Sequence, residues 1–345
     1  MTVEWTLSKR YKPKEVYFIV KDTSAMRIIV TELIWPIGIE RLEKIGWSVV
    51  YDPGLWKDTE RLGELLADAD ALIVRNQTKV TRQLLEQAPK LKVVGRLGVG
   101  LDNIDLPATA DRDVVVVFGK NANATSVAEY VIGAIFTCIR SLTDASADVK
   151  QGGWDRKRFT GGEIADKTLG LIGVGEISHR VAIRARALGM RIIGYDPYVA
   201  PYDFPVTESG VELVSLDRLY GESDFISMHI PLTAQTRNLI GKEALAKMKS
   251  SAYVINSSRG GIINEADLAD ALRGKVIAGA VLDVLDEEPP ATNHLLLGVE
   301  ECFITPHIAG LTEESQVRTS ELVANEVIRE LEGQVSLCRV ATRKT

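Results

Sequence analysis

The sequence predicts an α/β protein with two doubly wound, parallel-sheet domains and a cleft between them. Short runs rich in β-branched residues alternate with helical patterns along most of the chain, which is typical of parallel sheets covered by helices. A chain of 345 residues is also longer than one small hydrophobic core requires. The strands fall into two series, and the change between them comes at residues 121–124.

The first series contains five predicted strands with helical stretches between them, for example Gly38–Ile45 and Thr81–Gln87. The short connections favour one open sheet. Residues 1–25 precede this series, and the sequence leaves open whether they are native. The predicted strands are Ile28–Thr31, Ser48–Tyr51, Ala71–Val74, Val93–Gly95 and Val114–Val117.

A helical pattern then runs from Ser126 to about Lys150. Its start is apolar almost all round, so we expect it to be buried in a domain junction or a subunit interface.

A last helix, at about Glu313–Glu332, comes too late to continue the second alternation and is expected to return to the first domain. This predicts a discontinuous domain, residues 1–120 plus 306–345, and a second domain, residues 121–305. The second strand series is Thr168–Ile172, Arg191–Tyr195, Phe225–His229, Ala252–Asn256, Gly279–Leu282 and Cys302–Thr305.

The composition is that of an ordinary globular protein, with 46% hydrophobic and 26% charged residues. A formal net charge of -6 disfavours a nucleic-acid partner. The three cysteines, Cys138, Cys302 and Cys338, are far apart and form no CxxC pair, which predicts a reduced, cytoplasmic protein without disulfides or a zinc site. The most apolar stretch, Val127–Ile139, is short and carries Glu129, so no membrane association is expected.

A glycine-rich turn marks the start of the second domain's first predicted helix. The sequence Gly173-Val174-Gly175-Glu176-Ile177-Ser178 directly follows the strand Thr168–Ile172. Two glycines let the turn close and bring backbone N–H groups against a pyrophosphate at the helix N-terminus, as in the Rossmann dinucleotide motif. Ser178 stands in place of the third glycine and is small enough for close packing. Glu176 puts a carboxylate beside the expected pyrophosphate unless its side chain turns to solvent.

The acidic residue that should bind the cofactor ribose is Asp196. It lies 196 − 173 = 23 positions after the first glycine, close to the spacing of dinucleotide-binding proteins. Pro197 and Tyr198 follow it, so a 2′-phosphate would meet a carboxylate and no arginine. The pattern therefore favours NAD over NADP.

Three later segments each follow a predicted strand, at the edge where open α/β sheets bind ligands. They are Asn256-Ser257-Ser258-Arg259-Gly260-Gly261, Asp283-Val284-Leu285-Asp286-Glu287-Glu288-Pro289 and Thr305-Pro306-His307-Ile308-Ala309-Gly310. Together with Gly98-Val99-Gly100-Leu101-Asp102-Asn103-Ile104-Asp105, Ser126-Val127-Ala128-Glu129 and His229-Ile230-Pro231-Leu232-Thr233, they resemble the D-2-hydroxyacid dehydrogenase family from about residue 27 to residue 333.

This resemblance implies a role for each matching residue. His307 resembles the general acid and base, Glu288 the partner that orients its imidazole, and Arg259 the cation that binds the substrate carboxylate and polarises the carbonyl. Backbone N–H groups of Val99 and Gly100 resemble a second carboxylate anchor, in the other domain. The implied cofactor-binding residues, with Asp283 at the nicotinamide carboxamide, are Gly173, Gly175, Glu176, Ile177, Asp196, Pro231, Ser257 and Asp283.

Each catalytic candidate also has a purely structural interpretation. His307 alone is compatible with a structural residue at a domain crossover, Arg259 with a surface ion pair, and Glu288 with a solvated acidic turn. Only the flanking segments, in one order, favour the catalytic roles. His179 and His294 lack such a setting, so we expect them to be exposed structural residues, and His229 is expected to belong to the cofactor loop.

The substrate is less clearly indicated. Arg75, in Val74-Arg75-Asn76-Gln77-Thr78, resembles the phosphoglycerate dehydrogenase branch, where an arginine faces the cleft and can bind a second anionic group. Asn76 replaces the serine often found there. The resemblance is to a short form without the C-terminal regulatory domain. The expected substrates are 3-phosphoglycerate, sulfolactate or another three-carbon acid with a terminal anion, and otherwise glycerate or glycolate, as for a glyoxylate or hydroxypyruvate reductase.

The resemblance also implies an assembly and a mode of motion. A homodimer is expected through the nucleotide domain and the helix that begins at Ser126. Hinges are expected near Lys120–Asn123 and Thr305–Gly310. An alternative of a different class is an NAD-sensing binding protein in transcriptional corepression, since some proteins of this fold act in that way; a third is a catalytically inactive subunit.

Overall fold

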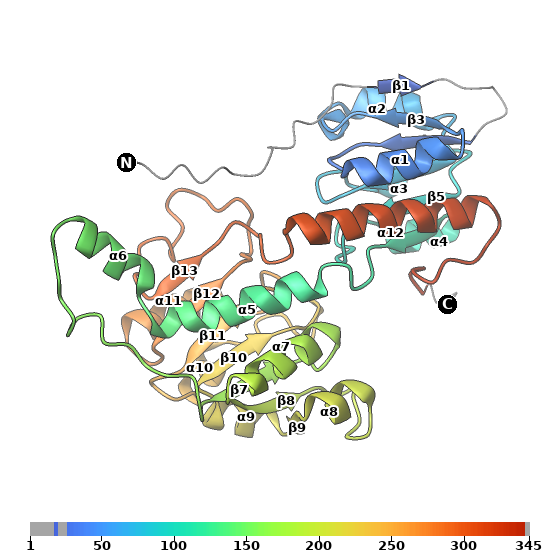
Figure 1. Ribbon diagram of the computed structural model, residues 1–345. Coiled ribbons are helices and arrows are strands. Elements are labelled where there is room, and N and C mark those ends of the chain that lie inside the picture. Colours follow the sequence, from blue (N-terminus) through green and yellow to red (C-terminus); the bar gives the residue numbers. More distant parts are fainter. Residues whose placement is uncertain (1–16, 20–25, 342–345) are drawn as a thin grey trace. The chain divides into compact units, whose positions relative to one another are not determined.

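The computed structural model describes residues 17–19, of which only the backbone is considered, and residues 26–341. The chain forms two compact units (Figure 1), one ending at Asn123 and resuming at Glu313, the other spanning Ala124–Thr312. The division therefore comes after Asn123 and Thr312 instead of after residues 120 and 305. Most of residues 1–25, whose origin the sequence left open, lie outside the described residues. Each unit is described by itself.

The first unit is built on a six-stranded sheet in the order β1-β3-β2-β4-β5-β6. Five of these strands are parallel and match the predicted series, whereas β1 pairs antiparallel with β3 and was not predicted. A strand of three residues gives too short a pattern to recognise. The strands are β1 (Tyr17–Ile19), β2 (Arg27–Val30), β3 (Ser48–Tyr51), β4 (Ala71–Val74), β5 (Val93–Arg96) and β6 (Val115–Phe118).

Helices cover both faces of this sheet (Figure 1). The late helix α12 packs against α1 and β5, and it lies so close to β5 that a Cβ on Gly95 would come within 2.7 Å of Val327. The helices of this unit are α1 (Pro36–Lys44), α2 (Thr59–Leu66), α3 (Arg82–Glu86), α4 (Leu106–Asp111) and α12 (Glu313–Leu331), with a 3-10 turn at Leu55–Lys57.

The second unit contains a seven-stranded sheet in the order β13-β12-β11-β10-β7-β8-β9, with every pair parallel. The predicted α/β architecture with two parallel sheets is therefore confirmed. The strand order reverses between β7 and β10, so the loops after these two strands flank a topological switch point. The strands are β7 (Thr168–Ile172), β8 (Arg191–Tyr195), β9 (Glu212–Leu213), β10 (Phe225–Met228), β11 (Tyr253–Asn256), β12 (Gly279–Leu282) and β13 (Cys302–Ile304).

The predicted single helix from Ser126 to about Lys150 is wrong, because the chain forms two helices that meet at an angle of 56°. α5 buries an apolar stripe, whereas α6 buries none of its residues, so nothing holds it in line with the sheet. Leu142 N already bonds to Arg140 O, which ends the first helix. The helices are α5 (Ala124–Ile139), α6 (Leu142–Lys150), α7 (Glu176–Ala187), α8 (Phe204–Ser209), α9 (Leu216–Glu222), α10 (Lys242–Ala246) and α11 (Glu265–Arg273).

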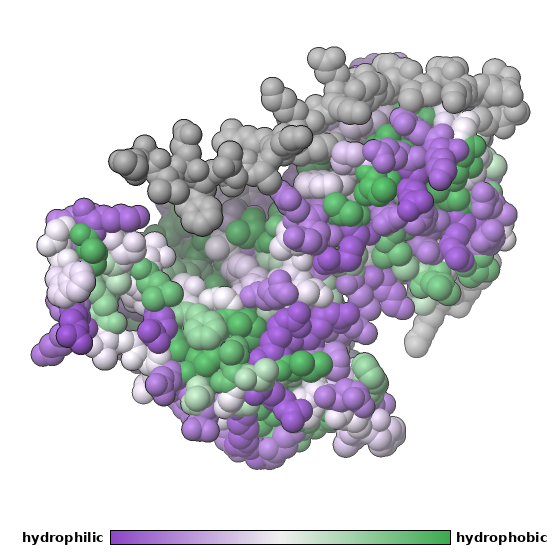
Figure 2. Space-filling view, viewed as in Figure 1, coloured by the Kyte–Doolittle hydropathy of each residue, from purple (hydrophilic) through white to green (hydrophobic). Residues whose placement is uncertain are grey.

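In the described part of the chain no single helix is long and apolar enough to cross a membrane; α5 and α6 meet the length and composition criteria only as a bent pair. Figure 2 shows apolar side chains gathered over α5 and α7 on the visible face of the second unit. Exposed apolar residues of these two helices are Phe136 of α5 and Ile183 of α7, which are 39% and 45% exposed.

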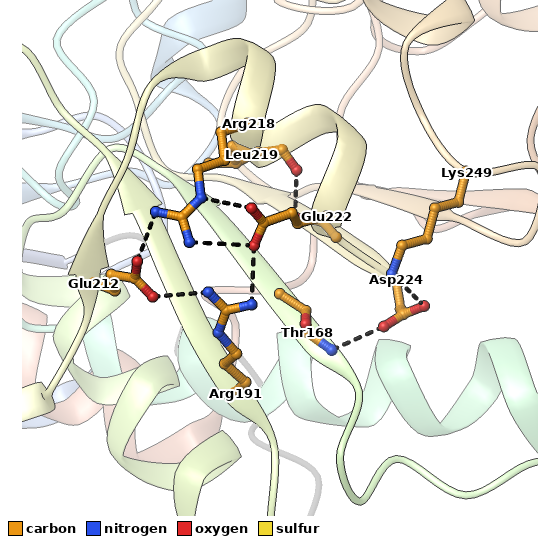
Figure 3. A network of polar contacts seen from close by, with 9 residues as sticks. Thr168, Arg191, Glu212, Arg218, Leu219, Glu222, Asp224 and Lys249 are labelled. Carbon is orange, nitrogen blue, oxygen red and sulfur yellow. Dashed lines mark hydrogen bonds and ion pairs between the residues drawn. The ribbon is translucent and has the colours of Figure 1, made fainter.

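A network of ion pairs lies at the amino-terminal edge of the second sheet (Figure 3). Arg191, at the start of β8, pairs with Glu212 and Glu222 at 2.8 and 2.9 Å, and Arg218 pairs with the same two carboxylates at 2.6 and 2.5 Å. These contacts join β8, β9 and α9 at the edge opposite the loops that follow the strands. The network is therefore part of the scaffold.

Candidate active site

The turn after β7 shows why two glycines are needed there. Gly173 has φ +89°, and a Cβ on it would lie 2.5 Å from the carbonyl oxygen of His229, which follows β10. Only glycine combines this conformation with this close approach. Gly175 has ordinary backbone angles, and a Cβ on it would meet no atom within 4 Å. The first glycine lets the turn pack against the loop after β10, and the second leaves space at the start of α7.

Ser178 fulfils the packing role predicted for the third glycine position and adds a hydrogen bond. Its side chain is fully buried, and Oγ donates to Gly173 O at 2.5 Å. This bond from α7 back to the turn stabilises the turn although the third position of the motif is not glycine. The departure from the usual pattern at Ser178 is therefore compatible with a dinucleotide site.

Asp196 lies against this turn at the carboxyl end of β8. Its Oδ2 accepts from Val174 N and its Oδ1 from Tyr198 N, both at 2.9 Å. Each oxygen keeps a second lone pair that can accept from a ribose hydroxyl. The structure places Pro197 and an exposed Tyr198 next in the chain, as the sequence requires.

Glu176 does not present an unpaired charge to the turn, because its carboxylate forms an ion pair with Arg180 one helical turn later. The same guanidinium donates to Glu176 O at 3.0 Å. The Glu176 side chain is half-exposed. The electrostatic conflict expected at this position is thereby reduced. Of the other predicted cofactor contacts, Ile177 is half-buried on α7 and Pro231 is exposed in the loop after β10.

Two buried polar atoms near the switch point have no hydrogen-bond partner: Nδ1 of His229 and Oγ of Ser257. The other ring nitrogen of His229 lies 3.0 Å from Ser227 Oγ. Burial lowers the pKa of His229 to about 4, so the ring is neutral and its free nitrogen can bond to a polar ligand. Unsatisfied buried polar atoms are rare and often mark a ligand site. The open space at Gly175 and these two atoms fit a dinucleotide such as NAD.

Two of the three catalytic candidates are in direct contact. His307 Nδ1 lies 2.7 Å from Glu288 Oε2, and Leu285 N donates to Glu288 Oε1 at 3.1 Å. Burial raises the pKa of Glu288, but the hydrogen bond and charge of His307, Leu285 N and the charge of Arg259 together lower it below the ordinary value. Glu288 is therefore ionised at neutral pH, where it fixes the ring orientation and leaves Nε2 of His307 for proton exchange.

The backbone at His307 is held in an unusual conformation by Asp283. His307 has φ +54°, which is uncommon for a residue other than glycine. The buried Asp283 accepts from Ile308 N at 2.8 Å, Ala309 N at 2.7 Å and Thr305 Oγ1 at 2.6 Å. Tyr130 of α5 extends the network with a 2.6 Å bond to Thr305. Asp283 thus holds the loop on both sides of His307, whereas its contact with the nicotinamide carboxamide stays a prediction.

Arg259 lies on the loop after β11, at the same edge of the sheet. Its Nη1 donates to Ser258 O at 2.6 Å, and its own carbonyl oxygen accepts from Asn256 Nδ2 at 2.8 Å. Its positive charge is one of the groups that lower the pKa of Glu288. Arg259, Glu288 and His307 therefore come from the loops after β11, β12 and β13, three adjacent strands.

The three residues predicted to bind substrate from the other domain lie in the first unit. Arg75 follows β4, and Val99 and Gly100 follow β5. No acceptor among the described residues bonds to the backbone nitrogen of Val99 or Gly100. Burial lowers the pKa of Arg75, and the charge of Glu32 opposes this change. The two loops belong to neighbouring strands of one sheet.

Sequence reasoning missed several residues around these sites. Glu32, Thr305 and Tyr130 act through hydrogen bonds to loops far away in the sequence, and no local pattern marks them. Two histidines expected to be exposed are not: His294 is bonded to Glu265 at 2.9 Å with a side chain only 12% exposed, and His179 packs on the ring of Phe204.

Comparisons with known proteins show which family has this sequence and fold. The model of the "D-isomer specific 2-hydroxyacid dehydrogenase, NAD binding domain" family matches residues 132–309. The chain is 45% identical to a D-3-phosphoglycerate dehydrogenase of Methanocaldococcus jannaschii, over 90% of this chain and 58% of that protein. It is 42% identical to an (S)-sulfolactate dehydrogenase of Chromohalobacter salexigens, over 88% of this chain and 98% of that one. A crystal structure of a glyoxylate reductase from Paecilomyes thermophila is similar, with 30% identity, a TM-score of 0.82 and coverage of 93% and 100%.

The fold and the turn after β7 define a two-unit α/β protein with an NAD(P)-binding domain. More particularly, the chain belongs to the D-isomer specific 2-hydroxyacid dehydrogenase family, which confirms the resemblance carried by its motifs. It spans less than three fifths of the length of the phosphoglycerate dehydrogenase from Methanocaldococcus jannaschii. The matched relatives act on different acids, so family membership does not specify the substrate.

Proposed function

We propose that the protein interconverts a 2-hydroxy acid and the corresponding 2-oxo acid, and that the acid has three carbons and a terminal anion, such as 3-phosphoglycerate. The observation that carries the proposal is the 2.7 Å contact between His307 and Glu288 at the carboxyl edge of an NAD(P)-binding sheet. A histidine that is held by a carboxylate at one nitrogen, and whose side chain is 52% exposed, is suited to exchange a proton with a substrate.

The proposed roles follow from the chemistry of each group. His307 donates a proton to the oxygen of the 2-oxo group during reduction and takes it back during oxidation. Glu288 orients the ring and stabilises the imidazolium. Arg259 binds the substrate carboxylate through two parallel N–H groups and polarises the carbonyl. NAD, when bound, supplies the redox chemistry, and the protein supplies orientation and electrostatics.

The cofactor preference is proposed to be NAD over NADP. Gly173, Gly175, Ile177, Pro231 and Ser257 would surround the dinucleotide. Asp196 would accept hydrogen bonds from ribose hydroxyls, and its negative charge would repel a 2′-phosphate. Measured binding of NADH and NADPH by fluorescence tests this point directly.

The preference for a terminal anion rests on Arg75 and on the N–H groups of Val99 and Gly100, for which the described residues provide no acceptor. Val99 N and Gly100 N would bind the carboxylate, and the guanidinium of Arg75 would bind the second anion. Phosphate and sulfonate both satisfy this chemistry, and the relatives include enzymes for each. A glyoxylate or hydroxypyruvate reductase is the alternative, favoured by the solved relative that is a glyoxylate reductase.

The test is the initial rate of NADH oxidation with 3-phosphohydroxypyruvate, sulfopyruvate, hydroxypyruvate, glyoxylate and pyruvate. A preference for one terminally anionic acid supports the proposal, and Arg75→Ala should then lower its kcat/KM by about 100-fold, because a charged hydrogen-bonded contact is lost. An unchanged kcat/KM in Arg75→Ala would contradict the terminal anion. Tight NADH binding without turnover of any acid would favour the non-enzymatic, NAD-sensing alternative.

A homodimer is proposed for the assembly. The exposed apolar residues over α5 and α7 in Figure 2 are compatible with a subunit contact through the nucleotide domain. Sedimentation at several protein concentrations tests this, and a monomer at all of them would contradict it.

A further inference from the structure

A carboxylate of the protein itself occupies the switch point of the first sheet. Glu32 follows β2, and its two oxygens accept four backbone N–H groups from four consecutive residues after β4. Glu32 is 3% exposed. The donors are Arg75 N and Thr78 N to Oε1, both at 2.9 Å, and Asn76 N at 3.1 Å and Gln77 N at 2.9 Å to Oε2.

This arrangement leaves no hydrogen-bonding capacity unused. An ionised carboxylate has about four lone-pair sites, and here four backbone N–H groups and the Thr78 side chain donate to it. Four N–H groups that point to the interior need acceptors, and solvent does not reach this position. The four N–H dipoles also offset much of the negative charge of Glu32, so a second anion can bind near it at lower electrostatic cost.

The same loop is held on its carbonyl side by Asn103. Asn103 Nδ2 donates to Arg75 O at 3.2 Å and to Thr78 O at 2.8 Å. Asn103 belongs to the Gly98–Asp105 segment that carries Val99 and Gly100, and Val80 N bonds to Asn103 O at 2.8 Å. Glu32 thus holds the loop of Arg75 through its N–H groups, and Asn103 joins the same loop to the segment of the other anchor. The position of Arg75 relative to that anchor therefore depends on both residues.

We propose that Glu32 is a positioning residue that sets the distance between the two anion anchors of the first unit, and that it thereby selects 2-oxo acids with a second anionic group. The inference rests on the proposed function for the identity of the anchors. It goes beyond that function by assigning the selection to a residue that does not touch substrate. Removal of the Glu32 carboxylate should therefore impair binding of long dianionic acids more than binding of short acids with one anchor.

The first experiment is independent of any substrate. In Glu32→Ala the four N–H groups lose their acceptor, and added formate can replace it. We expect a lower unfolding temperature that sodium formate restores in a saturable manner, since a ligand that binds only the folded state raises its stability. Sodium chloride at equal ionic strength should not do so. The matched control is Asp68→Ala, which removes an exposed carboxylate paired with Lys90 in the same unit and should show no formate effect. We call the four N–H groups of residues 75–78 that surround the Glu32 carboxylate the Glu32 cradle. If formate did not restore the stability of Glu32→Ala, these N–H groups would not form an anion site, and the proposal would be overturned.

The second experiment measures selection. The variants are Glu32→Gln, which keeps the side-chain shape, and Glu32→Ala. In both we expect KM for the best terminally anionic acid to rise about tenfold or more, because a charged hydrogen bond to the substrate is misplaced. KM for glyoxylate should change less than about threefold. Formate should reverse part of the change in Glu32→Ala but not in Glu32→Gln, whose amide still fills the cradle. Equal losses for both acids would overturn the proposal while leaving the proposed function intact. If the unmodified protein reduces neither acid, the proposed function fails. The formate titration still shows whether the four N–H groups bind the carboxylate of Glu32 as an anion.

Discussion

The two parallel sheets use their switch points in opposite ways. In the first sheet the carboxylate of Glu32 fills the position between the ends of β2 and β4 and satisfies four backbone N–H groups. In the second sheet Gly173 and Gly175 follow β7, and buried atoms of His229, after β10, and of Ser257, after β11, have no hydrogen-bond partner. Both places present polar backbone groups at the carboxyl edge, as expected for open α/β sheets. One is closed by the protein, and the other is left for a ligand.

The difference shows how one architecture can serve two tasks. In the first sheet the carboxylate of Glu32 holds the loop of residues 75–78 in place, and Arg75 on this loop is available for a ligand. A switch point kept open by Gly175 can receive a phosphate group directly at a helix N-terminus. Unit 1 therefore suits recognition of a variable acid, and unit 2 suits recognition of a constant cofactor. This division is proposed for the substrate and supported for the cofactor by the NAD-binding family match.

The largest expected effect is at the open switch point. Gly173→Ala places a Cβ 2.5 Å from His229 O on a residue with φ +89°, so we expect the variant to unfold several degrees earlier and to bind NADH about 100-fold more weakly or worse. Thermal unfolding and NADH fluorescence titration measure both effects. The carbonyl of His229 cannot move far, because it belongs to the backbone that follows a central strand.

Gly175→Ala is the matched control for this comparison. Its Cβ meets no protein atom and its φ is −102°, so the unfolding temperature should hardly change. NADH affinity should nevertheless fall about tenfold, because the methyl group occupies the space proposed for the pyrophosphate. Unchanged NADH affinity in Gly175→Ala would show that the space is not used by the cofactor and would remove the contrast between the two switch points.

The closed switch point should respond to pH. The pKa of Glu32 lies below its ordinary value of 4.5: burial raises it, but the N–H groups of Thr78, Gln77 and Arg75 lower it more. A carboxylate with a lowered folded-state pKa adds stability above the unfolded-state pKa and loses it as pH falls through the folded-state pKa. Relative to Glu32→Gln, the unmodified protein should be more stable by about 2 kcal/mol at pH 7, and the difference should shrink below pH 4.5.

Denaturant unfolding of both proteins between pH 3 and pH 7 measures this difference. The comparison with Glu32→Gln removes the contribution of all other carboxylates, which titrate in the same range in both proteins. A difference that stays constant down to pH 3 would mean that Glu32 is not the titrating group. A difference that grows as pH falls would have the opposite sign to the one expected from a lowered pKa of Glu32, and it would contradict the hydrogen bonds proposed to stabilise the ionised carboxylate.

The sequence predicted the open switch point much better than the closed one. The turn at Gly173 and Gly175 has a local pattern, since the strand, the glycines and the helix are adjacent, and Asp196 lies one strand further on. The cradle of Glu32 joins residues 43 to 46 positions apart, and it depends on β2 and β4 being neighbours in the sheet. A single glutamate after a strand has no distinctive pattern. Its role became visible only with the strand order.

The same reason explains the other differences. Asp283 was predicted as a cofactor contact from its motif, but its bonds to Ile308 and Ala309 depend on the pairing of β12 with β13. The break between α5 and α6 has no glycine or proline at Arg140–Ser141; it reflects the end of the buried stripe, which is a tertiary property. Local patterns predicted elements and motifs, whereas contacts between loops of different strands required the structure.

The smallest effect is expected at the amino-terminal edge of the second sheet, where the network of Figure 3 lies. Arg218→Ala removes two ion pairs, to Glu212 and Glu222, but Arg191 still bonds to both carboxylates. Exposed pairs contribute little and are screened by salt, so the unfolding temperature should change by less than about 2 °C, and less still in 1 M salt. NADH affinity should stay the same, because this edge is opposite the loops after β7 and β10. A change in NADH affinity as large as that of Gly175→Ala would show that the two edges of the sheet are coupled through the strands. The geometry of the open switch point would then depend on the whole sheet and not on its glycines alone.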